Sequence, residues 1–456
     1  MTTQPAQRKP DKGQELDLRI DALAFGGNGV ARIPIGERSY VVFVRDAIPG
    51  DRVRAVITKR KRDYAEARTL EVLEPGPDRV PPQADHPGAP WQVLPYERQL
   101  EVKAEQVEDA LRRLGRLDGF EMEPIVAADE TWRYRNKLEY SFGAGEAGEL
   151  VCGFHAPGSW ERIEHVEDCL LASERGNDVR RRALEVFRVM GAEPYDRRAQ
   201  TGFLRNLVVR EGRRTGQLQV RVVTSPGALD AAPIAEALAD VDSLIWTQAA
   251  GVGETTQGGR DELLAGVPRI DEELCGLRFS LSSEAFFQTN TEMADRLYGV
   301  AQEYAALKGW ERVWDLCCGI GTIGLTLAPR AAEVLGVEIV ASAIEDAQAN
   351  ARANEIGNVR FVAGDVRLVL KELIEKRERA DVVVVDPPRA GLSRKVVDRI
   401  AESSPKRIVY VSCNPTTLAP NAAQLVEAGY RLARVRPVDM FPQTPHIECV
   451  ALLERA

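Results

Sequence analysis

Apolar and polar positions divide the chain into two parts with different patterns. From about residue 311 onward, short β-branched runs predict strands, and the segments between most of them repeat apolar residues with the helical period. Such alternation is typical of a doubly wound α/β sheet, and a last pair of strands without a long intervening helix predicts a final antiparallel strand. The predicted strands cover residues 312–317, 333–339, 359–365, 380–386, 407–412, 430–438 and 447–453. The helical patterns include residues 342–354, 393–403 and 417–427.

The beginning of the chain follows the two-residue period of strands. Residues 1–13 are polar and are expected to be disordered. Residues 14–75 contain short alternating runs separated by Gly-rich and Pro-Gly turns, a pattern that predicts a small barrel of the oligonucleotide-binding kind. Arg32, Phe43, Arg45 and the basic run at 59–62 are candidate contacts to nucleic acid. The predicted strands are 16–20, 29–33, 40–44, 52–57 and 67–73.

The middle of the chain combines a linker, a helix and further strands. Residues 75–95 are rich in proline, and residues 96–114 repeat apolar positions with a helical period. Residues 133–267 return to strand patterns, with 204–210 and 217–224 as the clearest hairpin. We therefore expect a linker and central β-rich RNA-binding domain over 76–282, followed by the α/β domain over 283–456.

Composition limits the function classes without naming one. A net charge of −9 excludes a uniformly basic surface, although local basic clusters in the first half are sufficient to neutralise phosphates. The chain begins without an apolar signal-peptide core and has no apolar run of transmembrane length, so we expect a cytoplasmic protein with no membrane partner. The 7 cysteines are scattered, which predicts reduced thiols and no disulfide framework.

A glycine-rich turn follows the first strand of the α/β domain. Gly319 and Gly321 belong to a Gly-x-Gly-x-x-Gly spacing that, taken alone, fits a dinucleotide as well as S-adenosylmethionine. Asp315, just before this turn, favours S-adenosylmethionine because a carboxylate suits its positively charged end. Glu338 closes the second strand and is expected to hold ribose hydroxyls, and Asp365 closes the third and is expected to reach the adenine.

Two further strand ends carry the candidate chemistry. Asp386-Pro-Pro, taken alone, predicts an enzyme that methylates exocyclic amines, whereas a lone Cys413 at a strand end is more often a packing residue. Together with Glu448 they fit methylation at a pyrimidine carbon: a thiolate adds to carbon 6, and a base later removes the proton from carbon 5. A cytosine-C5 enzyme with two cysteines would carry a thiol where this chain has Arg389. A non-catalytic RNA-binding protein on the same fold stays as a further alternative.

Several motifs together resemble the TrmA/RumA family of RNA 5-methyluridine methyltransferases, and residues 21–32 resemble a TRAM domain. The resemblance rests on Gln288-Thr-Asn, the glycine turn, Asp386-Pro-Pro-Arg, Ser-Cys413-Asn-Pro and the segment 441–448. It implies that Cys413 is the nucleophile, that Glu448 is the base, and that a helix beginning near residue 96 packs on the catalytic domain. It implies that Gln288, Glu338 and Asp386 contact the cofactor, in addition to Asp315, Gly319, Gly321 and Asp365, which the strand ends and the glycine turn predict. The expected substrate contacts are Phe286, Arg389, Arg133, Arg135 and Lys137.

The chain departs from this family at one point. Many RumA-like members hold an iron–sulfur cluster with four cysteines, but residues 80–91 contain none, and Cys169 alone occupies a ligand position. We therefore predict no cluster, and no zinc despite the spacing of Cys152 and His155. The sequence predicts a monomeric enzyme that uses S-adenosylmethionine to methylate carbon 5 of a uridine in RNA, with ribosomal RNA favoured over transfer RNA.

Overall fold

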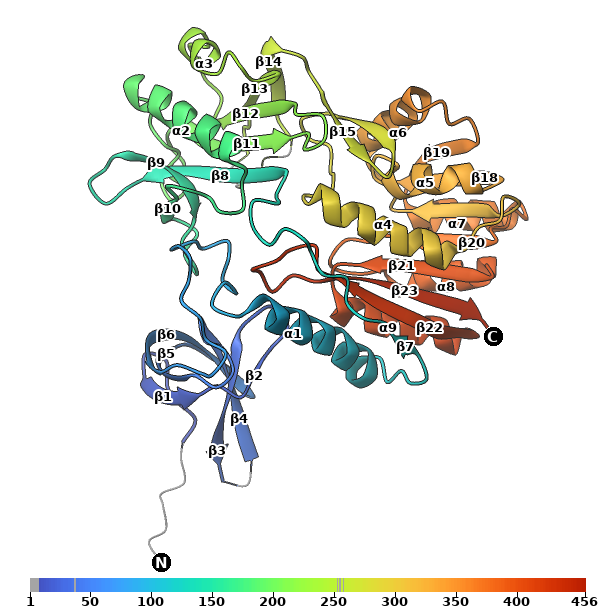
Figure 1. Cartoon of the computed structure of the whole chain (residues 1–456), viewed down its shortest axis with the longest axis horizontal. Coiled ribbons are helices and arrows are strands. Elements are labelled where there is room, and N and C mark those ends of the chain that lie inside the picture. Colours follow the sequence, from blue (N-terminus) through green and yellow to red (C-terminus); the bar gives the residue numbers. More distant parts are fainter. Residues whose placement is uncertain (1–7, 37, 252, 254–255, 257) are drawn as a thin grey trace, which may run out of the picture. The chain divides into compact units, whose positions relative to one another are not determined.

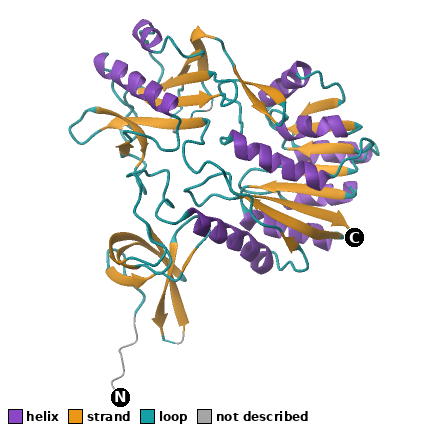
Figure 2. Cartoon of the chain, viewed as in Figure 1, coloured by secondary structure: helices purple, strands orange, loops and turns teal. Residues whose placement is uncertain are grey.

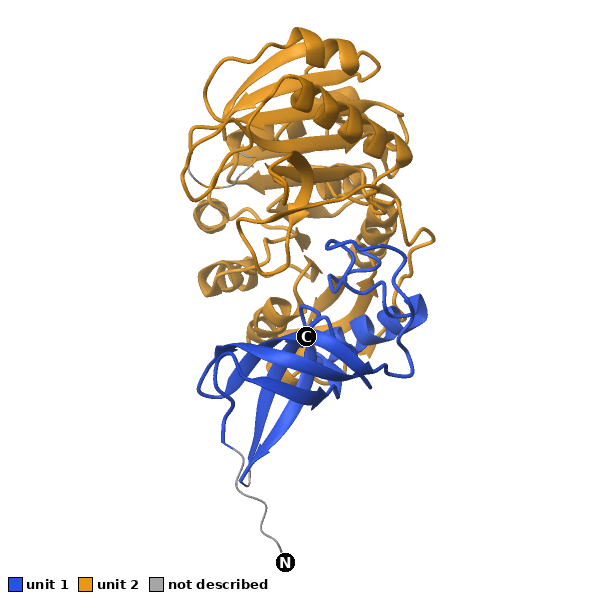
Figure 3. Cartoon of the chain, turned by 90° about the vertical axis from the view of Figure 1, so that its left-hand side faces the viewer, with its two compact units in different colours: residues 1–109, 441–447 blue, residues 110–440, 448–456 orange. Residues whose placement is uncertain are grey.

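The computed structural model describes residues 8–36, 38–251, 253, 256 and 258–456. These residues form two compact units, one made of residues 1–109 and 441–447 and the other of 110–440 and 448–456 (Figure 3). The course of the chain is shown in Figure 1, and Figure 2 separates its helices from its strands. Among the described residues, no helix has the length and apolar character needed to cross a membrane.

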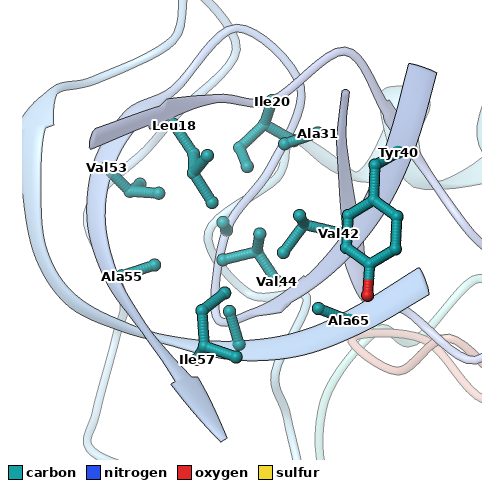
Figure 4. Packing of buried hydrophobic residues seen from close by; sticks show 12 residues of the cluster. Leu18, Ile20, Ala31, Tyr40, Val42, Val44, Val53, Ala55, Ile57 and Ala65 are labelled. Carbon is teal, nitrogen blue, oxygen red and sulfur yellow. The ribbon is translucent and has the colours of Figure 1, made fainter. Parts of the chain in front are cut away.

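The first unit begins with a curled sheet that has the strand order β1-β5-β6-β4-β3-β2. Alternating residues of its strands point inward, so side chains such as Leu18, Val42, Val44 and Ile57 form a core that curved strands surround (Figure 4). The pairing of β4 with β6 is parallel, and the other pairs are antiparallel. The strands are β1 (Glu15–Arg19), β2 (Ala22–Leu23), β3 (Gly29–Ile35), β4 (Arg38–Arg45), β5 (Arg52–Arg60) and β6 (Tyr64–Glu74).

A buried carboxylate fastens the segment that follows the barrel. Asp51 is fully buried, accepts hydrogen bonds from the backbone N–H groups of Ile48 (2.9 Å) and Gly76 (2.8 Å), and pairs with Arg79 at 2.7 Å. Burial alone would raise the pKa of Asp51, but these hydrogen bonds lower it overall. The linker then leads to α1 (Tyr96–Asp109).

The predicted helix near residue 96 is divided between the two units. Its first part, α1, belongs to the first unit, and its continuation as a π-helix, η1 (Ala110–Leu114), belongs to the second. Within the second unit, η1 packs against α9 (Pro415–Glu427) of the α/β domain. Packing of α1 itself on the catalytic domain stays a prediction.

The central part of the second unit is a sheet with the order β10-β9-β8-β11-β12-β13-β14. The predicted hairpin is present as β11 and β12, while β13 joins β12 in parallel after the short helix α3 (Ala232–Ala237). Helix α2 (Glu174–Val189), which the sequence analysis did not predict, packs on β9 and β11, and Ser173 caps its first turn. The strands are β8 (Lys137–Ala144), β9 (Leu150–His155), β10 (Ile163–His165), β11 (Leu204–Glu211), β12 (Leu218–Thr224), β13 (Ser243–Gln248) and β14 (Arg260–Gly266).

A hairpin connects the central sheet to the α/β domain. It consists of β15 (Ile270–Leu274) and β16 (Leu277–Leu281), and it is followed by α4 (Thr291–Ala305). The hairpin packs on α6 (Ala341–Ala353) of the α/β domain, where the Asn350 side chain accepts a hydrogen bond from the Ser280 backbone N–H at 2.9 Å. The hairpin is therefore attached to the α/β domain.

The α/β domain has the strand order β19-β18-β17-β20-β21-β23-β22-β7. Strands β17–β21 are parallel, and β23 lies antiparallel between β21 and β22, which confirms the predicted final antiparallel strand. The short edge strand β7 (Glu121–Met122), which was not predicted, pairs in parallel with β22. The strands are β17 (Arg312–Leu316), β18 (Glu333–Glu338), β19 (Val359–Ala363), β20 (Val382–Val385), β21 (Arg407–Ser412), β22 (Tyr430–Val438) and β23 (Glu448–Arg455). The accompanying helices are α5 (Thr322–Leu327), η2 (Ala328–Arg330), α6 (Ala341–Ala353), α7 (Val366–Glu375), α8 (Arg394–Ser403) and α9.

Candidate active site

The glycine turn after β17 bends the chain sharply before α5 begins. Cys317, Gly319 and Gly321 have φ angles of 61°, 53° and 84°, a left-handed conformation that glycine adopts without steric cost. A Cβ atom on Gly321 would lie 3.0 Å from the ring of Phe361, so this position also requires the absence of a side chain. The turn brings backbone N–H groups to the carboxyl edge of the sheet, where parallel α/β folds bind their ligands.

Asp315 lies fully buried beneath this turn. Its Oδ2 accepts a hydrogen bond from the backbone N–H of Gly324 at 2.8 Å, while its buried Oδ1 has no partner among the described residues. Burial raises the pKa of Asp315 to about 7, and the nearby charges of Asp386 and Glu338 act in the same direction. An unpaired buried carboxylate oxygen costs free energy, so this atom fits a site whose ligand supplies a donor or a positive charge.

Glu338 at the end of β18 fixes the same turn from the other side. One carboxylate oxygen accepts from Gly319 N at 3.1 Å, and the other accepts from the backbone N–H groups of Ile339 (2.7 Å) and Val340 (3.0 Å). The side chains of Ile339 and Val340 are left exposed, at 68% and 51%. They give the carboxyl edge an apolar surface of the kind that flat aromatic rings cover.

Asp365 comes just after β19 and caps α7. Its side chain accepts a hydrogen bond from Leu368 N at 3.2 Å, which satisfies a donor in the first turn of the helix. The Leu368 side chain is 55% exposed and adds to the apolar surface at this edge. Asp365 therefore has a structural role in addition to the adenine contact predicted for it.

The segment before α4 presents an amide and an aromatic ring. Gln288 is buried and hydrogen-bonds to the hydroxyl of Tyr298, which also lies 3.1 Å from the Thr322 hydroxyl at the start of α5. The side chain of Asn136 donates to the Gln288 carbonyl at 2.9 Å and fixes its backbone. Phe286, two residues earlier, is 66% exposed, an unusual position for a phenylalanine and one that suits stacking.

Cys413 follows β21 directly and lies half-buried before α9. The antiparallel register ends with Ser412 paired to Cys449, so Cys413 follows the last pair on one strand and Glu448 precedes Cys449 on the other. Asn414 begins α9 as its cap, accepting from Thr416 N at 3.0 Å. The thiol is therefore held between a strand end and a helix start.

The groups around this thiol are strongly coupled. Burial raises the pKa of Cys413 to about 11, and the charges of Glu448 and Asp386 add to the effect, whereas Arg389 opposes it. Burial also raises the pKa of Glu448 well above its usual range, with Asp386 adding to the shift and Arg389 again opposing it. Burial raises the pKa of Asp386 to about 7. These groups form one electrostatic cluster at the carboxyl edge.

The position of Arg389 is set by hydrogen bonds that the sequence analysis did not identify. Asn414 Nδ2 donates to the Arg389 carbonyl at 2.9 Å, and the Thr417 hydroxyl donates to the same oxygen at 3.3 Å. Asn421 holds the next part of the loop through both the N–H (2.8 Å) and the carbonyl (3.0 Å) of Leu392. A helical Asn is not recognisable as functional from sequence, because its partner lies on another loop.

The basic residues predicted to contact substrate occupy several environments. Arg133 makes a two-pronged ion pair with Asp168, with the shorter contact at 2.7 Å, and Lys137 pairs with Glu139 at 2.6 Å. Burial lowers the pKa of Lys137. Arg135 is half-buried. Contact of these residues with RNA stays a prediction.

Two buried arginines that were not predicted support the segment before Phe286. Arg210 donates to the Ala285 carbonyl at 2.6 Å, and Arg221 donates to the Ser283 carbonyl at 3.0 Å. Both side chains lie on strands of the central sheet and are almost fully buried. These two positive charges therefore hold backbone inside the protein and do not belong to a basic surface.

Comparison with known proteins explains this arrangement. A family model described as tRNA (Uracil-5-)-methyltransferase matches residues 269–456, and a TRAM domain model matches residues 11–70. An uncharacterized RNA methyltransferase of Halalkalibacterium halodurans is 38% identical, with 98% of each chain covered. One from Porphyromonas gingivalis is 39% identical over 96% of this chain and 99% of the relative. The chain belongs to the RNA (uracil-5-)-methyltransferase family.

A solved structure of the same family agrees with this assignment. The crystal structure of Pyrococcus abyssi tRNA (uracil-54, C5)-methyltransferase in complex with S-adenosyl-L-homocysteine matches with a TM-score of 0.77 and 28% identity. The match covers 96% of this chain and 100% of that chain. The chain is thus an RNA methyltransferase dependent on S-adenosylmethionine, as predicted, with a TRAM segment and an α/β catalytic domain.

The residues at the carboxyl edge fit that cofactor. The unpartnered oxygen of Asp315, the backbone of the glycine turn and the exposed apolar surface at Ile339 and Val340 suit a positively charged end, a ribose and an adenine. Among the described residues, no cluster of three or more His, Cys, Asp or Glu is arranged to hold a metal ion. The absence of an iron–sulfur cluster stays a prediction from the missing cysteines.

Proposed function

We propose that this RNA methyltransferase forms 5-methyluridine through a covalent bond between Cys413 and carbon 6 of the target uridine. The observation that supports the proposal is the end of the β21–β23 ladder, where Cys413 follows the last paired residue of β21, Glu448 begins β23, and the charge of Glu448 contributes to the raised pKa of Cys413. Glu448 begins β23, and Cys413 sits in the short turn between β21 and α9, so both groups are held close to the paired strand ends. The pair supplies a nucleophile and a base at one place, as methylation of an unreactive ring carbon requires.

The chemistry assigns one role to each group. The Cys413 thiolate would bond to carbon 6 and make carbon 5 nucleophilic. S-adenosylmethionine would supply the methyl group to carbon 5, with its sulfonium–methyl bond breaking to leave S-adenosylhomocysteine. Glu448 then removes the proton from carbon 5, the sulfur–carbon 6 bond breaks, and the double bond of the ring is restored. Arg389 supports both ionised forms, because its charge opposes the raised pKa values of Cys413 and Glu448.

The remaining predicted residues complete the site. Gln288, Asp315, Gly319, Gly321, Glu338, Asp365 and Asp386 are proposed to bind the cofactor. Phe286, exposed beside this edge, is proposed to stack on a target base that has left its helix. Arg133, Arg135 and Lys137 are proposed to contact the RNA backbone, with the enzyme acting as a monomer in the cytoplasm.

We infer that ribosomal RNA is the substrate class, because the chain carries a TRAM segment at residues 11–70. Transfer RNA is the second candidate, favoured by the likeness to the Pyrococcus abyssi enzyme, which is a tRNA (uracil-54, C5)-methyltransferase. Mapping 5-methyluridine in total RNA from cells with and without the gene separates the two. Nuclease digestion of the same product to nucleosides excludes methylation of an amine if it yields 5-methyluridine.

The covalent step is tested with RNA that carries 5-fluorouridine, since fluorine cannot be removed as a proton. The wild-type enzyme with S-adenosylmethionine should give a protein–RNA complex that survives denaturing gel electrophoresis. Cys413→Ala should give none, whereas Cys275→Ala, which removes another half-buried thiol, should trap RNA like the wild type. Equal trapping by Cys413→Ala would refute the proposed nucleophile.

A further inference from the structure

The segment immediately before Glu448 belongs to the other compact unit. Strand β22 ends at Val438 in the second unit, the chain then contributes Phe441–Ile447 to the first unit, and β23 starts with Glu448 in the second. Figure 3 shows this division of the chain. The proposed base is therefore joined by a single peptide bond to a segment that the N-terminal unit holds.

A reciprocal pair of glutamines binds this segment. The backbone N–H of Gln443 donates to Gln99 Oε1 at 2.9 Å, and Gln99 Nε2 donates back to Gln443 Oε1 at 2.8 Å. Gln99 lies on α1, is fully buried, and also donates to the Leu94 carbonyl at 3.0 Å. The backbone N–H of Trp91 donates a further hydrogen bond to the Gln443 carbonyl at 3.0 Å. Gln443 is thus fixed through its backbone N–H, its carbonyl and its side chain.

A buried lysine holds the start of the same segment. Lys103, one helical turn after Gln99, is fully buried and donates from Nζ to the Phe441 carbonyl at 3.0 Å. Its ammonium group also lies 5.6 Å from the ring centroid of Trp91. Lysine is among the residues least often fully buried, so its use here as a backbone ligand is costly.

The far end of the segment is held by close packing. Gly27 of the barrel has φ of 91°, and a Cβ atom there would lie 2.8 Å from Pro445. Within the segment, the Thr444 hydroxyl donates to the Phe441 carbonyl at 2.8 Å, which closes a turn. Contacts at both ends and an internal bond leave this segment little freedom.

We propose that Gln99 and Lys103 are positioning residues for Glu448, which act by fixing the segment that precedes it. Apolar side chains could hold this loop without the cost of burying a lysine and an amide. Hydrogen bonds are directional, however, and therefore fix the position of the loop more precisely. The proposal rests on the assignment of Glu448 as the base. The N-terminal unit would then govern proton removal in addition to its predicted contact with RNA.

This role predicts a defect at one step of the reaction. A displaced Glu448 slows removal of the carbon-5 proton, whereas addition of Cys413 and methyl transfer come earlier and are spared. The methylated RNA therefore remains bonded to the enzyme. A general structural defect would instead slow every step together.

The test uses Gln443→Leu and Lys103→Met in the full-length enzyme, so that failure of one variant to fold leaves the other. Gln106→Leu is the matched control, because Gln106 lies on the same helix but donates to barrel carbonyls at Leu23 and Ala24. Turnover on uridine RNA is measured beside the denaturation-resistant complex that carries labelled methyl from S-adenosylmethionine. The rate of trapping on 5-fluorouridine RNA reports the earlier steps.

Both test variants should lose turnover by about tenfold or more while 5-fluorouridine trapping stays within about twofold of wild type. The methyl-labelled complex on ordinary uridine RNA should accumulate severalfold, and Gln106→Leu should behave like the wild type. Trapping that falls in step with turnover, or turnover loss without the labelled complex, overturns the positioning role. Absence of trapping by the wild-type enzyme would instead refute the proposed covalent mechanism itself.

Discussion

Replacing Asp315 by asparagine should stabilise the cofactor-free enzyme and weaken its binding of S-adenosylmethionine. Asparagine keeps an acceptor for the Gly324 N–H and removes the buried charge whose other oxygen has no partner among the described residues. Because the folded-state pKa is raised, folding becomes less favourable as pH rises from the unfolded pKa to the folded one. The stability gained by the substitution is therefore small near pH 4 and reaches its full value above pH 7.

The size of the gain follows from the pKa shift. The pKa of Asp315 rises from 3.8 to about 7. That is a change of about 3 units, which corresponds to about 4 kcal/mol at about 1.4 kcal/mol per unit. Asparagine also loses part of the charge-assisted bond to Gly324, which costs about 1 kcal/mol. We expect a net gain of about 2 to 3 kcal/mol at about pH 8.

Asp51→Asn is a matched control that should change the stability in the opposite direction. Asp51 is equally buried, but its pKa is lowered, so its ionised form contributes stability above the unfolded pKa that is lost as pH falls through the folded one. Its replacement leaves Arg79 unpaired and should cost about 3 kcal/mol at neutral pH. The two aspartates lie in different compact units, so calorimetry should separate the transitions.

The assay is calorimetric unfolding at about pH 4.5 and about pH 8, with and without S-adenosylmethionine. Asp315→Asn should raise the midpoint without ligand at the higher pH and show a much smaller ligand-induced shift than wild type. If Asp315→Asn lowers stability at the higher pH, or keeps the full ligand shift, the burial argument is wrong.

Three further outcomes are expected from the site geometry. Arg389→Met should slow 5-fluorouridine trapping by about tenfold at each pH, because loss of the cation raises the pKa of Cys413 above about 11; trapping rates measured across pH check this, and rates equal to those of the wild type contradict it. Gly391→Ala should destabilise the fold by about 2 kcal/mol, since φ is 72° and the new Cβ would lie 2.9 Å from Thr417; denaturant midpoints measure it. Asn414→Ala should lower the free energy of unfolding by about 1 to 2 kcal/mol and slow 5-fluorouridine trapping, because it removes both the helix cap and the bond to Arg389. Asn414→Ser keeps the cap, so it should regain most of the stability but not the trapping rate. Equal trapping rates for the two variants and the wild type would show that the bond to Arg389 is dispensable.

Local pattern was enough to predict most of the α/β domain. Buried parallel strands give continuous β-branched runs such as Val382–Val385, and the helices between them have a different period, so order and type follow from short-range signals. The short β7 and the helix α2 were missed. A two-residue edge strand carries almost no periodic signal, and α2 is rich in arginine, which obscures its apolar face.

By itself, the sequence predicted which groups gather at the carboxyl edge, because Asp315 and Glu338 lie near the ends of their strands, Cys413 follows β21, and parallel strands end together. Tertiary structure decided how those groups act. Antiparallel insertion of β23 between β21 and β22 brings Glu448 to the end of the ladder where Cys413 follows β21, and burial, which depends on the whole packed domain, raises the pKa values of the acids. The glutamine pair that holds residue 443 joins positions 344 residues apart. Local periodicity carries no information about contacts at such a separation, so only the folded chain brings them together.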